Sequence, residues 1–100
     1  MKPSREELAQ TADVAEWGWL RAHLERGGVI VVSTDMDLVD VGLAVAADEA
    51  AVVDRWISAR QLTKPTAEQI SEWGAAPAKR FRLLVVSPYV LIQELPEEKH

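Results

Sequence analysis

The sequence has 100 residues, 48% hydrophobic and 27% charged, which predicts one globular domain with one core rather than a disordered chain. The formal net charge of −5 argues against nucleic-acid binding, because phosphates repel an acidic surface. No apolar run approaches the ~20 residues of a membrane span, and the polar N-terminus lacks the apolar segment of a signal peptide. The absence of cysteine excludes disulfides and thiolate catalysis. We therefore expect a cytoplasmic protein.

The first quarter of the chain carries two signatures of helix starts. Ser4, with a glutamate three residues later, matches a capping box, in which each side chain bonds a free backbone N–H of the first turn. This first helix is expected to end near Thr11. Asp13, also with a glutamate three residues later, repeats the signature, and apolar residues at helical spacing follow. The pattern predicts a second helix over Val14–Arg26, ended by Gly27.

The next stretch, GGVIVVSTDMDLVD, is the one around which we expect the other elements to pack. Val29–Ser33 is apolar up to its serine, which predicts a strand covered on both faces. Three acids follow it, Asp35, Asp37 and Asp40. Asp35 or Asp37 is expected to cap a helix over Leu38–Ala47, since an aspartate accepts hydrogen bonds from free backbone N–H groups.

Two further helices are predicted in the second half of the chain. Asp48 is expected to cap a helix over Glu49–Arg60, whose apolar residues form one stripe at helical spacing. Thr66, with a glutamine three residues later, forms another capping box and predicts a short helix over Ala67–Trp73. In this short helix Ile70 and Trp73 are expected to face the core.

The last apolar segment, Arg82–Leu95, has the composition of a strand, and Ser87-Pro88 interrupts it. Because two-residue hairpin turns favour glycine or asparagine, we favour one bent strand over two strands. The sequence thus predicts an α+β domain spanning 1–100, in the order α-α-β-α-α-α-β(β), with a two- or three-stranded sheet covered by about five helices. Its core covers about 4–95, and 96–100 form a charged tail. Such a small sheet leaves an edge open, so we expect homodimerisation through strand addition.

The acidic turn is the first candidate site. Ser33, Asp35, Asp37 and Asp40 follow a strand at its C-terminal end, where α/β proteins often place sites. Clustered carboxylates are also ligands that hard cations prefer. The pattern is too short for an EF-hand, and acids at a helix start stabilise it by capping and by opposing its dipole. We favour capping, and binding of a small ligand or divalent metal is the alternative.

Aromatic side chains are the second candidate site. The sequence has four tryptophans, and three lie on apolar stripes where the protein core is expected, namely Trp17, Trp56 and Trp73. Trp19 and Tyr89 can be exposed, and exposed aromatic residues are typical of partner surfaces. His23 with a carboxylate is the only candidate for acid–base catalysis. No nucleophile or oxyanion donor accompanies it, so an enzyme is the least favoured class and no cofactor is implied.

Three segments carry a resemblance to a known family: GGVIVVSTDMDLVDVGLAVAADEAAVVDRW, LTKPTAEQISEW and LLVVSPYVLIQE. With them the chain, over Glu7–Glu94, resembles the domain of unknown function 2288 family of small bacterial proteins. Tyr89 stands where that family usually has tryptophan. The resemblance implies one compact domain and no known activity or catalytic residue. We predict a non-enzymatic protein-interaction module, homodimeric, that docks a protein partner through an open sheet edge or near Trp19 and Tyr89.

Overall fold

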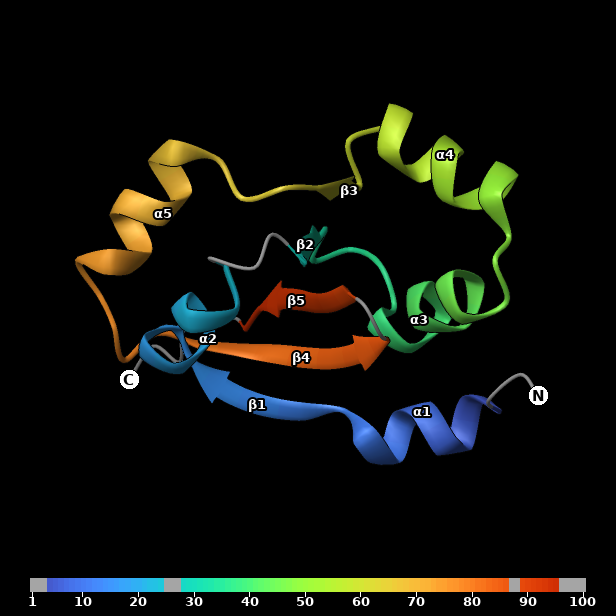
Figure 1. The fold of residues 1–100 in the computed structure, drawn as a ribbon, viewed down its shortest axis with the longest axis horizontal. Coiled ribbons are helices and arrows are strands. Elements are labelled where there is room, and N and C mark those ends of the chain that lie inside the picture. The colour runs from blue at the N-terminus through green and yellow to red at the C-terminus, as the bar shows by residue number, and fades with distance from the viewer. Residues whose placement is uncertain (1–3, 25–27, 87–88, 96–100) are drawn as a thin grey trace.

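The computed structural model describes residues 4–24, 28–86 and 89–95, which form five helices and five strands (Figure 1). Within these residues no helix is both long enough and apolar enough to cross a membrane. The elements, in chain order, are α1 (Arg5–Thr11), β1 (Asp13–Glu16), α2 (Trp17–Leu24), β2 (Val29–Val32), α3 (Leu38–Ala46), α4 (Ala50–Ser58), β3 (Leu62–Thr63), α5 (Ala67–Gly74), β4 (Arg80–Val86) and β5 (Tyr89–Glu94).

The strands form one mixed sheet in the order β1-β4-β5-β2-β3. The pair formed by β5, the central strand, and β2 is parallel, and the other three pairs are antiparallel. The α+β class is confirmed, but the prediction of a two- or three-stranded sheet is wrong because the sheet has five strands. The strands that the prediction lacked are the two edge strands, β1 and β3, and a separate β5.

The two edge strands are absent from the prediction for different physical reasons. Asp13–Glu16 has the sequence signature of a helix start, yet its backbone pairs with β4, from Asp13 opposite Leu83 to Glu16 opposite Arg80. The Asp13 carboxylate accepts a hydrogen bond from the next backbone N–H instead of capping a helix. The other edge strand, β3, has two residues, which is too short for an alternating pattern to reveal.

The last two strands form an antiparallel hairpin, in which Val86 lies opposite Tyr89. The favoured prediction of one bent strand over Arg82–Leu95 is therefore wrong. The physical reason is that β4 and β5 pair in register over six residues, and the backbone hydrogen bonds along this ladder outweigh unfavourable turn chemistry. The turn residues, Ser87-Pro88, lie outside the described residues, as do Gly27 and the expected tail 96–100.

Helices cover both faces of the sheet, with α2 and α5 on the left of Figure 1 and α1, α3 and α4 on the right. On the α3 side the sheet contributes Leu84 and Leu91 to a core that α1 and α3 complete. On the α5 side the core centres on Trp17, Trp73 and Phe81. The Trp73 ring centroid lies 4.9 Å from the centroids of both other rings. Alternating side chains of the inner strands thus serve two separate cores.

Local sequence signals correctly predict three helix starts. The Ser4 hydroxyl accepts a hydrogen bond from the backbone N–H of Glu7 at the start of α1. Thr66 and Gln69 form both bonds of the predicted capping box at the start of α5. Asp37 caps α3. These signals succeed because each depends only on residues within one helical turn.

Candidate functional site

Asp37 is the centre of the acidic turn, and both of its carboxylate oxygens accept hydrogen bonds. One carboxylate oxygen accepts backbone hydrogen bonds from Val39 and Asp40, at 2.9 and 3.3 Å. The other accepts from Arg5 at 2.7 Å, and Arg5 also binds the Asp40 carboxylate. The hydrogen bond from Arg5 lowers the pKa of Asp37, assisted by the backbone donors and opposed by partial burial. This arrangement ties α1 to the start of α3.

The loop before α3 is held in place by a buried glutamine. The Gln93 amide nitrogen donates hydrogen bonds to the carbonyl oxygens of Ser33 and Met36, at 2.8 and 2.7 Å. The Ser33 hydroxyl donates to the Asp35 carboxylate. Across the described residues, no group of three or more acidic or histidine side chains is placed to hold a metal ion. The geometry of the acidic turn therefore supports a capping and bracing role.

The structure separates the two exposed aromatic candidates. Trp19 lies on α2, beside the α5-side core, with 55% of its surface exposed. Tyr89 lies on β5 and is 43% exposed. Its side chain shares a sheet face with Leu91, which belongs to the α3-side core. The two aromatic residues therefore belong to different surfaces, and the His23 side chain lies outside the described part of the structure.

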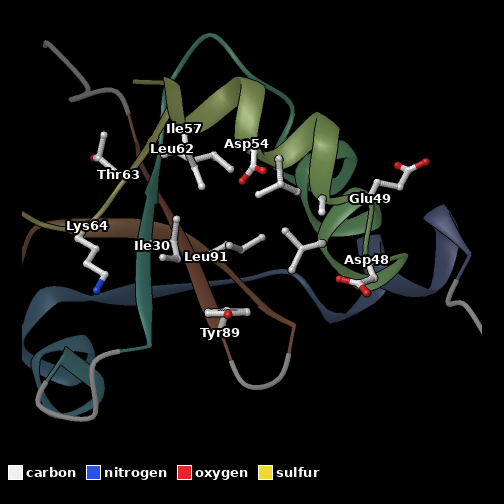
Figure 2. Close-up of a pocket in the computed structure, with 13 residues that line it drawn as sticks. Ile30, Asp48, Glu49, Asp54, Ile57, Leu62, Thr63, Lys64, Tyr89 and Leu91 are labelled. Atoms are coloured by element: carbon white, nitrogen blue, oxygen red, sulfur yellow. The ribbon is translucent and has the colours of Figure 1, made fainter. Parts of the chain in front are cut away.

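Tyr89 lines an open groove between α4 and the sheet, with a volume of about 460 Å³ (Figure 2). Apolar side chains from three strands form its floor, and the charged side chains around it are exposed. Figure 2 shows Tyr89 across the groove from α4, with Lys64 at one end and Asp48 and Glu49 at the other. The full lining is Ile30, Val45, Asp48, Glu49, Ala50, Val53, Asp54, Ile57, Leu62, Thr63, Lys64, Tyr89 and Leu91.

The groove exists because α4 packs loosely against the rest of the domain. None of the nine residues of α4, all within the described chain, is fully buried. Val53 and Trp56 are half-buried, and Ile57 is 52% exposed. An amphipathic helix normally buries its apolar stripe, but in α4 part of this stripe remains exposed to solvent.

Two sharp turns fix the position of α4. Asp48, after α3, and Arg60, after α4, both have left-handed backbone conformations, with φ of 56° and 62°. At each end the backbone N–H groups bond back across the last helical turn, as in a Schellman motif. Asp48 thus ends α3, and the sequence prediction that its side chain caps α4 is wrong. Glu49 occupies the cap position and makes no side-chain cap bond.

The family described as "Protein of unknown function (DUF2288)" matches residues 3–94. The chain belongs to the DUF2288 family. The NMR solution structure of PA1075 from Pseudomonas aeruginosa is similar to this DUF2288 chain, with a TM-score of 0.78 and 29% sequence identity. The match covers 93% of this chain and 85% of that one. No curated protein matches the chain. The family resemblance predicted from the sequence is therefore confirmed.

In this DUF2288 chain Tyr89 is predictable from the sequence as a candidate exposed aromatic residue, but the groove that it lines is not. Most of its lining comes from the continuous segment 45–64, but β2 and β5 complete it from elsewhere in the sequence, so no local motif marks it. The sequence does contain one sign of the groove, the apolar stripe of α4 with acidic residues beside it. A helix with one apolar stripe and charged residues beside it covers only part of a sheet face, which indicates that room for a groove is left next to it.

Proposed function

We propose that this DUF2288 domain is a non-enzymatic protein-interaction module that docks an apolar segment of a partner protein in the groove beside α4. The observation that supports the proposal is the loose packing of α4, whose apolar side lines the groove without burying any residue completely. Apolar surface left in water is unfavourable, and it becomes favourable binding energy when a partner covers it.

The distribution of polar groups favours a protein partner over a small molecule. Small-ligand sites place a few polar groups inside the cavity, where they orient the ligand. In this groove the four charged side chains, Asp48, Glu49, Asp54 and Lys64, are all exposed, and the floor is apolar. An apolar centre with a charged, solvated rim is the usual anatomy of a protein–protein interface.

Site-specific photocrosslinking tests this proposal. A photoreactive amino acid replacing Ile57 in the groove should give a discrete crosslinked protein in the organism that makes the domain. That protein would then be purified and its affinity for the domain measured by isothermal titration calorimetry. We expect Tyr89→Arg to weaken binding at least about tenfold, because burying an unpaired cation in an apolar contact is costly.

Val85→Arg is the matched control for this experiment. Val85 is exposed on the neighbouring strand of the same hairpin, but its side chain lies on the opposite sheet face from Tyr89. The control substitution should leave partner affinity unchanged. Equal binding by the wild type and Tyr89→Arg would contradict the proposal, as would the lack of any purified partner that binds.

A second copy of the chain is the second candidate partner. Ile57 and Tyr89 are exposed apolar residues of one groove, and an isologous contact would bury the same patch on both subunits. The two sheet edges are less suited to self-association. The edge strand β3 has only two residues, and in the other edge strand, β1, the backbone N–H of Val14 already donates a hydrogen bond to the Asp13 carboxylate. Sedimentation velocity tests this homodimer, which Tyr89→Arg should dissociate and Val85→Arg should not.

A further inference from the structure

The rim of the groove carries an asymmetric charge. Asp48 and Glu49 lie at the start of α4 and Asp54 lies along it, whereas Lys64 is the one cation among the described lining residues. Figure 2 shows Lys64 at the end of the groove away from Asp48 and Glu49. Among the described residues, none of these four side chains takes part in an ion pair. The three carboxylates are therefore available to a cationic partner.

We propose that the partner segment is a basic amphipathic helix, an inference that rests on the proposed function of the groove. Its apolar side covers the exposed side chains of Ile57 and Tyr89 on either side of the apolar floor, and its lysine or arginine side chains meet the acidic rim. Opposite charges across an interface speed association and select between partners. The charge asymmetry also sets the direction of the helix, with its basic part at the end where α4 begins.

A helix fits this groove better than an added strand does. Strand addition depends on a row of free backbone groups, but β3 offers only Leu62–Thr63. Pro65 follows two residues later and has no backbone N–H to donate. Recognition therefore depends on side chains in the groove, which is how amphipathic helices bind.

A second copy of the chain matches the rim less well than a basic helix does. Each chain has a formal net charge of −5, and an isologous contact brings two acidic rims toward one another. Like charges facing each other across an interface oppose association. Charge complementarity thus favours a partner of opposite sign.

Two designed peptides test the inference directly. Both carry leucine at positions i, i+3, i+4 and i+7 of a helix, and they differ only in having lysine or glutamate at the polar positions. Binding to uniformly ¹⁵N-labelled full-length protein would be followed by amide chemical-shift changes. We expect the lysine peptide to shift groove residues and to bind at least about tenfold more tightly than the glutamate peptide, with a difference that shrinks at high salt.

Matched double substitutions locate the charge effect. Glu49→Gln with Asp54→Asn removes two carboxylates from the rim, and Glu68→Gln with Glu72→Gln removes two from α5 on the other side of the sheet. Because exposed ion pairs are individually weak, we expect the rim variant to bind the lysine peptide between about twofold and thirtyfold more weakly. The α5 variant should bind it with wild-type affinity.

The outcomes separate this inference from the proposed function. Equal binding of both peptides in the groove, lost in Tyr89→Arg, would overturn the basic helix while leaving the interaction module intact. Binding of the lysine peptide that is equally weakened by both double variants would overturn the role of the rim. Failure of both peptides to shift groove residues would overturn the inference, and a dimer seated in the groove would identify the second copy as its occupant.

Discussion

Substitution of Asp37 distinguishes the two structural roles of its carboxylate. Asp37→Ala removes both the helix cap and the ion pair with Arg5, whereas Asp37→Asn keeps an oxygen that can accept the backbone hydrogen bonds. An aspartate or asparagine cap contributes about 0.5–2 kcal/mol. An exposed ion pair contributes about 0.2–1 kcal/mol. We therefore expect Asp37→Ala to lower the free energy of unfolding by about 0.7–3 kcal/mol, and Asp37→Asn by less than about 1 kcal/mol.

The ion-pair contribution should depend on pH in a defined direction. The pKa of Asp37 is lowered in the folded protein from its ordinary value of 3.8, mainly by the hydrogen bond from Arg5. The ionised Asp37 carboxylate therefore contributes fully to folding stability at a pH above its ordinary pKa. This contribution is lost as the pH falls through the lowered pKa of the folded protein. The difference in stability between the wild type and Asp37→Asn should be present at about pH 7 and should disappear at strongly acidic pH.

Urea denaturation followed by tryptophan fluorescence measures these differences, because Trp17 and Trp73 are buried in the folded state. Arg5→Ala provides the control, since it should cost no more than the two exposed ion pairs and leave the cap intact. If Asp37→Asn destabilises the protein as much as Asp37→Ala, the helix cap does not contribute more to stability than the ion pair with Arg5. If the difference between wild type and Asp37→Asn persists at low pH, the carboxylate is not stabilised by Arg5.

Four further outcomes are expected, each measured by denaturation or thermal melting. Gly42→Val should destabilise by about 1–3 kcal/mol, because a side chain there meets the fully buried Leu84. Gln93→Leu should cost about 1–3 kcal/mol by leaving two loop carbonyls without their donor. Arg60→Gly should stabilise by roughly 0.5–1 kcal/mol, since glycine adopts a left-handed conformation without strain. Mg²⁺ should leave the melting temperatures of the wild type and of Asp37→Asn unchanged, because no three acidic side chains of the described residues are placed to hold a metal ion; a rise for the wild type alone would instead support metal binding by the acidic turn.

The parts of the fold that the sequence predicts depend on nearby residues. Helix starts at Ser4, Asp37 and Thr66 follow from hydrogen bonds within one turn, and β2 follows from an unbroken run of valine and isoleucine. Asp13–Glu16 shows the limit of this reasoning. It has the capping signature, but pairing with β4, far along the chain, decides its conformation.

The candidate site was predictable only in part for a similar reason. The sequence predicts Tyr89 as a candidate exposed aromatic residue, and the structure shows that its side chain is exposed. That Tyr89 and Ile57 line the same groove depends on the order of the strands in the sheet and on the turns at Asp48 and Arg60. Left-handed conformations at aspartate and arginine carry no reliable sequence signal, because glycine is the usual residue there. The groove therefore emerges only from the tertiary structure.

The central position of β5 has a consequence for the order in which the domain folds during synthesis. It lies between β4 and β2, contributes to both cores, and is the last strand in the described part of the chain. The parallel pair of β2 and β5 joins Val29 to Val90, so the contact that unites the sheet closes a very long loop. A ribosome-bound chain that lacks Tyr89–Glu94 has neither core complete. Stable folding must therefore wait until β5 has left the exit tunnel, and until then the apolar faces of β2 and β4 need protection from aggregation.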